Sequence, residues 1–315
     1  MAAIRTTQLR RVFGDTVAVD GLDLTVAEGE IFGLVGPDGA GKSTTMRMLA
    51  GILEPSGGTA MVAGCDVRRE GERLKDHVGY MSQRFGLYPD LTVLENILFY
   101  ADIYGVASRG RAGKIERLLG FSNLTPFTRR LAGNLSGGMK QKLGLACALI
   151  HTPRVLLLDE PTNGVDPVSR RDFWRILYQL VREGVTIFVS TAYLDEAERC
   201  GRVALMDRGR ILGLGTPPEV KRLLGGGTWE VRLERARAAA GFFRERLPRA
   251  AVALYGDRLH VTGTGLDEAG LRREAEAGGF AIGGIRAIEP SLEDVFVAVL
   301  AGREPAAGGE VDRAR

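Results

Sequence analysis

Residues 31–44 read IFGLVGPDGAGKST, a short apolar run followed by a glycine-rich loop and the start of a more polar segment. The apolar run is typical of a buried parallel strand, and the pattern from Lys42 to Leu49 predicts a helix. Between them GPDGAGKST has the spacing GxxxxGK[ST], in which glycines let backbone N–H groups turn inward around a polyphosphate. The helix N-terminus adds its dipole to the same place. The stretch therefore predicts a strand, a phosphate-binding loop and a helix in succession.

The residues of this loop have separate expected roles. Lys42 should reach the β- and γ-phosphates of a bound nucleotide, and the hydroxyl of Ser43 should bind Mg²⁺. A glycine-rich turn could match the spacing by chance, but a strand and a helix in register on either side argue against that. The residues expected to line the nucleotide are Gly36, Pro37, Asp38, Gly39, Ala40, Gly41, Lys42, Ser43 and Thr44.

A second apolar run, VLLLDE (residues 155–160), ends in two adjacent acids. Asp159 is expected to help hold the magnesium ion. Glu160 could polarise an attacking water molecule as a general base. The alternative for this acidic pair is an ordinary helix cap.

Strands and helices alternate along the first two thirds of the chain, which predicts an α/β domain with a parallel sheet covered by helices. Strands are expected at 31–36, 155–160 and 186–189, with helices at 42–49, 93–104, 137–150 and 168–183. Residues of about 84–150 are mostly helical and predict a helical insertion. Residues 202–217 predict two strands joined at Arg208-Gly209, which close the first domain, 1–224.

The pattern changes after the glycine-rich stretch LLGGGTW (residues 223–229). Strand, helix, two strands, helix and strand follow one another over 226–303, which predicts a small ferredoxin-like α+β domain. A last helix ends this domain. Residues 304–315 are rich in Gly, Ala and charge, and we expect them to be disordered.

Composition excludes several classes of protein. The 315 residues carry 42 basic and 39 acidic side chains, a balance that argues against a general nucleic-acid binder. The three cysteines have no CxxC spacing and are expected to be reduced and free of metal. No apolar run approaches the roughly 20 residues that span a bilayer. We therefore expect a soluble chain that reaches a membrane only through a partner.

LSGGMKQK (residues 135–142) predicts a second helix that begins with a serine and two glycines, another place where N–H groups could bind an anion. Taken alone, the stretch would be read as an ordinary helix with a serine N-cap. In order, however, GPDGAGKST, Gln83 in YMSQ, LSGGMKQK, LLLDEPT and NGVDP resemble the motifs of ABC-transporter ATPase subunits. The resemblance covers roughly residues 4–220. It implies a P-loop (RecA-like) core with antiparallel β and α-helical subdomains.

The resemblance also implies that the ligand is ATP with Mg²⁺ and assigns further residues. Phe13 would stack on the adenine, unless it is a plain core phenylalanine. Gln83 would sense the γ-phosphate and Mg²⁺. Ser136, Gly137 and Gly138 would contact the nucleotide of a second ATPase domain, so that two chains enclose two ATP molecules, and Asp166 would bridge the two sites.

The partners are implied by the same resemblance. In this family the segment 84–97 receives a cytoplasmic helix of the permease, and Phe85, Leu87 and Tyr88 are either contacts for it or local core. The ending PSLEDVF (residues 290–296) resembles daunorubicin-resistance ATPases, which work with ABC-2-type permeases. The pair GPDGAGKST and STAYLDEAE resembles a bacterial multidrug-export subgroup that also uses a membrane-fusion protein. The implied place is the cytoplasmic face of the bacterial plasma membrane.

Two positions depart from the family pattern. Asp38 stands where related loops often have asparagine, and Ala192 in STAYLDEAE stands where the family usually has a histidine that bonds the γ-phosphate. If another group replaces the histidine, Tyr193 is the nearest by sequence. The expectation is an exporter ATPase that is slowed by Ala192. The first alternative is a regulatory ATP-binding subunit that barely hydrolyses. The second, an ABC protein acting on ribosomes or DNA, would usually carry two ATPase domains or long coiled coils.

Overall fold

The computed structural model describes residues 2–83, 86–224 and 226–301. The chain divides into two compact units, which meet between Thr216 and Pro217. This boundary falls eight residues before the one expected at 224, because a short helix and a 3₁₀ turn after Thr216 pack within the second unit. The tail expected to be disordered, 304–315, lies outside the described residues.

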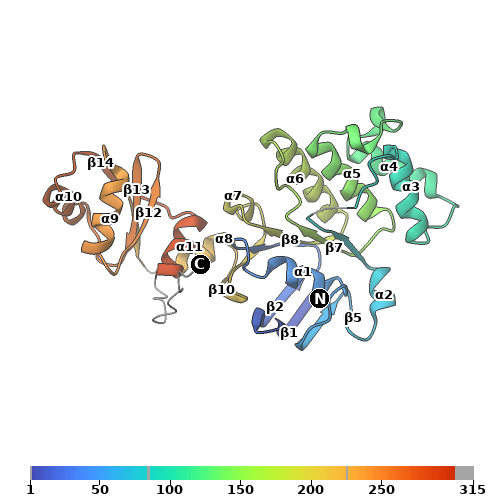
Figure 1. The fold of residues 1–315 in the computed structure, drawn as a ribbon, viewed down its shortest axis with the longest axis horizontal. Helices are drawn as coiled ribbons and strands as arrows, with labels where there is room; N and C mark the ends of the chain where they lie inside the picture. Colours follow the sequence, from blue (N-terminus) through green and yellow to red (C-terminus); the bar gives the residue numbers. More distant parts are fainter. Residues whose placement is uncertain (1, 84–85, 225, 302–315) are drawn as a thin grey trace, which may run out of the picture. The chain divides into compact units, whose positions relative to one another are not determined.

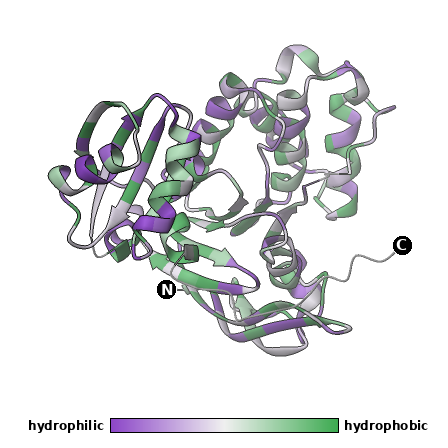
Figure 2. Ribbon diagram, turned by 60° about the vertical axis from the view of Figure 1, so that its left-hand side comes forward, coloured by the Kyte–Doolittle hydropathy of each residue, from purple (hydrophilic) through white to green (hydrophobic). Residues whose placement is uncertain are grey.

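The first unit is built around a six-stranded sheet in the order β10-β9-β3-β8-β7-β6 (Figure 1). Its strands are β3 (Ile31–Val35), β6 (Val78–Met81), β7 (Val155–Asp159), β8 (Thr186–Thr191), β9 (Arg202–Asp207) and β10 (Arg210–Gly215). All neighbouring pairs are parallel except β9 and β10, whose hairpin turns at Arg208 and Gly209 with positive φ angles. Strands β3, β7 and β8 are buried along their whole length, as their apolar runs predict, and Figure 2 shows hydrophobic colouring along much of the strands.

A smaller antiparallel sheet, β2-β1-β4-β5, completes this core. Its strands are β1 (Ala2–Phe13), β2 (Thr16–Ala27), β4 (Gly57–Val62) and β5 (Cys65–Asp66), and the short helix α2 (Gly71–Lys75) follows. Helix α1 (Lys42–Leu49) contacts strands of both sheets. Its buried side chains Met46, Met48 and Leu49 join one hydrophobic cluster with residues from each sheet. The loop before α1 is thereby held on the edge of a rigid core.

The helical region has a core of its own, made by α3 (Val93–Ile103), α4 (Arg111–Phe121) and α5 (Gly137–Leu149). Short 3₁₀ turns at Thr125–Phe127 and Ala132–Asn134 link α4 to α5. Thr92 and Glu95 form a capping box at the start of α3, which satisfies N–H groups that the helix leaves open. Helices and short turns therefore make up the stretch from Val93 to Leu149. After β7 the chain forms α6 (Pro167–Arg182), then β8, then the short helix α7 (Leu194–Ala197), and the hairpin of β9 and β10 completes the unit.

The second unit begins with α8 (Pro217–Lys221) and a 3₁₀ turn (Arg222–Leu224). Its sheet has the antiparallel order β12-β13-β11-β14. The elements are β11 (Gly227–Leu233), α9 (Ala236–Arg246), β12 (Ala251–Tyr255), β13 (Arg258–Gly263), α10 (Glu268–Ala277), β14 (Ile282–Ile288) and α11 (Leu292–Ala301). Helices α9 and α10 pack on one face through Ala239, Phe243 and Leu271. The sequence prediction of a ferredoxin-like βαββαβ order is confirmed.

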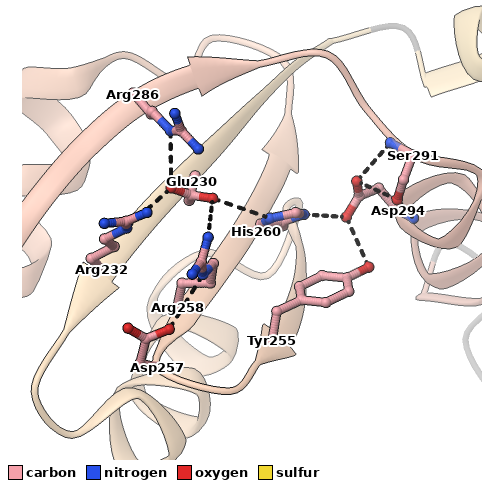
Figure 3. Close-up of polar contacts among 9 residues, drawn as sticks. All are labelled: Glu230, Arg232, Tyr255, Asp257, Arg258, His260, Arg286, Ser291 and Asp294. Atoms are coloured by element: carbon pink, nitrogen blue, oxygen red, sulfur yellow. Dashed lines mark hydrogen bonds and ion pairs between the residues drawn. The ribbon is translucent and has the colours of Figure 1, made fainter.

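The other face of this second sheet carries a polar network around the buried carboxylate of Glu230 (Figure 3). Arg286 Nε and Arg258 Nη1 approach its two oxygens at 2.9 and 3.1 Å. His260 lies between Glu230 and Asp294, with its Nδ1 2.9 Å from Asp294 Oδ1. Asp294 also accepts hydrogen bonds from the N–H and hydroxyl of Ser291, so it caps α11 while it contacts the sheet. PSLEDVF is therefore part of the unit's own packing.

Among the helices in the described part of the chain, none is both long and apolar enough to cross a membrane. The three cysteines, Cys65, Cys147 and Cys200, are free and buried. Burial raises the pKa of the Cys147 thiol well above its usual range. A thiol buried in this way is unreactive as a nucleophile.

Candidate functional site

The phosphate loop runs from Gly36 to Gly41, between the end of β3 and the start of α1. Gly36 donates its N–H to the Thr191 carbonyl at 3.2 Å, which ties the loop to the end of β8. Gly41 precedes α1 with a φ of 106°, and a Cβ atom there would overlap the carbonyl of Ala18. Pro37, Asp38 and Gly39 are exposed at the rim. Glycine is needed at position 41 for both backbone conformation and space.

Lys42 points back into this loop. Its Nζ donates to the carbonyls of Gly36 and Pro37, at 2.7 and 3.0 Å, and lies 3.1 Å from Glu160 Oε1. The Lys42 and Glu160 side chains are only 4% and 9% exposed. A buried cation needs close partners, and these carbonyls and the carboxylate supply them. Lys42 thus holds the Glu160 carboxylate and the loop together in this structure.

Asp159 stands at the end of β7 and is almost fully buried. Its Oδ1 accepts hydrogen bonds from Ser43 Oγ at 3.0 Å and from Ser190 Oγ at 2.7 Å. Tyr80 OH lies 3.5 Å from the other oxygen, and burial together with that carboxylate raises the pKa of Tyr80 to about 12. The predicted pair Ser43 and Asp159 is therefore brought together, with Ser190 as a partner that the sequence reading missed.

These residues fit a magnesium ion by their chemistry. Mg²⁺ prefers hard oxygen ligands and is usually bound by one or two protein groups together with phosphate oxygens and water. Ser43 and Asp159 supply a hydroxyl and a carboxylate within hydrogen-bond distance of each other. Within the described residues there is no cluster of three or more His, Cys, Asp or Glu side chains that could hold a metal alone. The arrangement suits an ion that arrives with a nucleotide.

Glu160 has a strained backbone, with a φ of 49° in the left-handed region that non-glycine residues rarely adopt. Its N–H is held by the carbonyl and the hydroxyl of Ser190, at 3.2 and 3.0 Å. Its Oε2 accepts from Gln83 Nε2 at 3.0 Å and from Asn163 Nδ2 at 3.3 Å. Such strain is tolerated where the surroundings determine the conformation, and it is often found in active sites. Gln83 was predicted here, whereas Asn163 was not.

The remaining predicted contacts form a second cluster at the N-termini of α5 and α6. Ser136 caps α5 by accepting from the N–H of Met139 at 3.3 Å, and Gly137 and Gly138 begin the helix. A Cβ atom on Gly138 would overlap the side chain of Ser169. Asp166 caps α6 through the N–H groups of Val168 and Ser169, and these hydrogen bonds lower its pKa. The glycine at 138 therefore has a packing reason within one chain.

The apolar and aromatic contacts implied by the resemblance have different outcomes. Phe13 is 45% exposed with the Arg11 guanidinium over its ring at 4.5 Å, so it is not a core residue, and its adenine role stays a prediction. Leu87 packs on the core of the helical region. Tyr88 is exposed, although its ring also contacts Phe99. Phe85 lies outside the described residues.

The segment after β8 holds Ala192, one of the two positions expected to depart from the family pattern. Ala192 is exposed, and the backbone beside it is anchored by the Thr191 hydroxyl, which accepts from the Tyr193 N–H at 2.9 Å. Glu196 is fully buried and accepts from Thr191 Oγ1 at 2.9 Å and Thr162 Oγ1 at 2.5 Å. Arg170 Nε of α6 lies 3.4 Å from the same carboxylate. Sequence reading missed this network because DEAE looks like an exposed acidic helix start.

Comparison with known proteins now adds to this geometry. Residues 19–163 match the family model described as ABC transporter. The chain is also similar to the daunorubicin/doxorubicin resistance ATP-binding protein DrrA of Streptomyces peucetius. The two are 40% identical over a match that covers 81% of this chain and 78% of DrrA. This chain belongs to the ATP-binding proteins of ABC transporters. The resemblance seen in its motifs is thereby confirmed.

Further relatives agree. The "Probable multidrug ABC transporter ATP-binding protein YbhF" of Escherichia coli is 54% identical over 67% of the chain, although the chain spans only 37% of that protein's length. A solved structure titled "Structure of ATP binding subunit of ABC transporter" matches with a TM-score of 0.65 at 27% identity, over 71% of this chain and 93% of the other. The fold expected from the sequence is confirmed.

Proposed function

We propose that this chain is the ATP-binding and ATP-hydrolysing subunit of a bacterial exporter of the multidrug type. The observation that carries the proposal is the convergence of Lys42, Ser43, Asp159, Glu160 and Gln83 at one end of the parallel sheet. In open α/β sheets this edge is where ligands bind. Phosphoryl transfer needs positioned charged and polar groups more than covalent chemistry, and these five side chains supply three charged and two neutral polar groups.

Each residue has a task in the proposed reaction. Lys42 exchanges its carbonyl and carboxylate partners for the β- and γ-phosphates, so substrate binding frees Glu160 Oε1. Glu160 then accepts a proton from the attacking water, while Gln83 keeps the other carboxylate oxygen in place. Magnesium, held by Ser43 and Gln83 with Asp159 behind them, would neutralise phosphate charge. Phe13 and the loop from Gly36 to Thr44 hold the nucleotide.

The second cluster supports a dimer. Ser136, Gly137, Gly138 and Asp166 stand at two helix N-termini, which attract anions. We propose that they close over the nucleotide of another ATPase domain, whether a second copy or a related chain. ATP binding would then bring two domains together, and hydrolysis would release them.

The exporter itself would contain other chains. An ABC-2-type permease, joined in one subgroup by a membrane-fusion protein, is the partner that the resemblance of PSLEDVF and STAYLDEAE to exporter ATPases favours. The chain would sit at the cytoplasmic face of the plasma membrane through that permease, and Leu87 and Tyr88 would lie in the docking region. The transported molecule would be selected by the permease.

The test is the full-length Glu160→Gln variant. It should bind Mg-ATP but release phosphate about 10²–10⁴-fold more slowly than the wild type, which is the usual contribution of a general base. In sedimentation with Mg-ATP it should also accumulate as a dimer, with itself or with a co-expressed partner ATPase. Glu183→Gln makes the same chemical change at an exposed position at the end of α6 and should keep the wild-type rate. Wild-type turnover in Glu160→Gln would contradict the proposed base.

A second candidate is a regulatory subunit that binds ATP and barely hydrolyses it, paired with a competent ATPase. Ala192 favours this candidate, because it removes the group that the family uses on the γ-phosphate. The ordered carboxylate of Glu160 speaks against it. Phosphate release by the wild-type chain, alone and with its partner, separates the two.

A further inference from the structure

Tyr193 follows directly on the alanine at 192, and its side chain is turned toward the catalytic carboxylate rather than away from it. Its hydroxyl lies 3.3 Å from Asn163 Oδ1, and Asn163 Nδ2 lies 3.3 Å from Glu160 Oε2. The three residues come from three consecutive parts of the site: the end of β7, the turn before α6 and the segment after β8. One connected path of hydrogen bonds therefore joins the departure site to Glu160.

The chemistry of the groups determines which one donates and which one accepts in each hydrogen bond of this path. A carboxylate paired with Lys42 can only accept hydrogen bonds, so Asn163 must present its NH₂ group to Glu160. The amide oxygen of Asn163 then faces Tyr193, whose hydroxyl donates to it. With the opposite amide orientation two acceptor oxygens would face each other at Glu160, although the Tyr193 hydroxyl could still accept from the NH₂ group. The Glu160 carboxylate thus sets the amide orientation, and Tyr193 holds Asn163 in place by donating to its amide oxygen.

The tyrosine ring is held in place independently of this contact. The guanidinium of Arg170 lies 4.5 Å from the ring centroid, and Arg170 itself is paired with the buried Glu196. Glu196 in turn binds Thr191 and Thr162, which flank Tyr193 and Asn163 in the chain. A buried ionic network below the surface therefore sets the distance between the two segments that the path joins.

We infer that Tyr193 is a positioning residue for hydrolysis, which acts through Asn163 on Glu160 and takes over part of the alignment lost with a histidine at 192. The inference rests on the proposed function. Tyr193 is not proposed to contact the phosphates. It therefore helps to align the base, but it does not replace the missing hydrogen bond to the γ-phosphate. When Lys42 turns to the phosphates, Gln83 and Asn163 remain to hold Glu160 Oε2.

The size of the effect follows from exposure. Asn163 is exposed and Tyr193 is 37% exposed, so water competes for both hydrogen bonds. Gln83 also binds the same carboxylate oxygen at the shorter distance of 3.0 Å. Loss of one such neutral hydrogen bond corresponds to a fall in rate of about three- to tenfold. Binding of ATP should change little, because Tyr193 does not belong to the loop.

The experiment compares Tyr193→Phe with Tyr178→Phe in the full-length chain. Both lose only a hydroxyl, the two tyrosines are 37% and 39% exposed, and Tyr178 OH bonds the Arg199 carbonyl instead of the site. We expect kcat for Mg-ATP to fall about three- to tenfold in Tyr193→Phe with KM unchanged, and to stay within about twofold in Tyr178→Phe. Asn163→Ala should lower kcat similarly, and the double variant should fall no further.

Each other outcome overturns the inference. An unchanged kcat in Tyr193→Phe, or additive losses in the double variant, would show that the path does not act on Glu160. A fall in both tyrosine variants would point to a general loss of structure. A wild-type chain that binds Mg-ATP without turnover would show that Glu160 is not aligned. Failure of the wild-type chain to bind Mg-ATP would instead defeat the proposed function itself.

Discussion

Ala192 is exposed at the position where we expect the family to use a histidine, and it leads to a prediction about rate. A single hydrogen-bond donor to transition-state charge is typically worth about 10²–10³ in rate. The path from Tyr193 already aligns Glu160, so Ala192→His restores the remaining charge stabilisation only. We expect a rise in kcat of about 10²–10³-fold with the KM for ATP nearly unchanged, measured by phosphate release at saturating Mg-ATP.

The outcome at Ala192 also separates explanations. If wild type is already fast and Ala192→His adds nothing, another group supplies the donor to the phosphate. If both proteins are slow while ATP binding is tight, the site cannot be restored at this position, and the regulatory subunit becomes the better account. In either case the predicted rise is contradicted.

Residues with a motif could be predicted from the sequence, and residues that act through tertiary contact could not. The spacing of GPDGAGKST predicted Lys42 and Ser43, and LLLDE predicted Asp159 next to them. Ser190 and Asn163 carry no spacing signal, because their partners lie far away in the chain or across a turn. The NGVDP turn was noticed, but only the structure shows that its asparagine reaches Glu160.

At the scale of elements, the polar face of the second unit's sheet predicts an acid-dependent stability. The Arg286 hydrogen bond, followed by that of Arg258, lowers the pKa of Glu230 from 4.5 to about 2. Because the pKa is lower in the folded state, the ionised carboxylate stabilises the fold fully above about pH 4.5. This stabilisation is lost as the pH falls toward about 2. This electrostatic stabilisation acts between strands, because Glu230 lies on β11, Arg258 on β13 and Arg286 on β14.

Glu230→Gln tests this contribution. In a Trp174→Phe background, Trp229 on β11 is the remaining tryptophan, and its fluorescence reports urea unfolding of the second unit. We expect the variant to have a lower unfolding midpoint at pH 6 and a weaker dependence on pH between about 4.5 and 2. Glu268→Gln, which removes an exposed carboxylate paired with Arg272 on α10, should leave the profile unchanged. Identical profiles for wild type and Glu230→Gln would contradict the role of the network.

Elements with a strong hydrophobic pattern were predicted closely. The apolar runs gave β3, β7 and β8 to within one or two residues, and the predicted start and end of α1 agree with the structure. The antiparallel strands β1 and β2 were expected only as part of a subdomain. Register shifts interrupt the pairing of β1 with β2 and β4, and irregular pairing of this kind weakens a simple alternation in the sequence.

At the scale of the whole molecule, order along the chain was easier to predict than the boundary between its parts. The glycine-rich stretch at 223–229 marks a change of pattern, and it suggested a border at 224. The border lies at Thr216, because α8 contacts α11, an element about 75 residues later. Contacts over such separations leave no local trace in the sequence. Within the proposed site, Gln83 and the second cluster around Ser136 and Asp166 were predicted only through resemblance to the family.

The central claim is that Mg-ATP binds at the loop of Lys42 and is hydrolysed there. The most direct measurement is phosphate release and Mg-ATP binding by the full-length wild type beside Lys42→Ala, with folding of both checked by circular dichroism. Lys75→Ala, which removes an exposed lysine paired with Glu72, is the matched control. We predict that Lys42→Ala releases no phosphate above background and binds Mg-ATP more weakly, while Lys75→Ala matches the wild type. A folded Lys42→Ala protein with the wild-type rate and affinity would contradict the account.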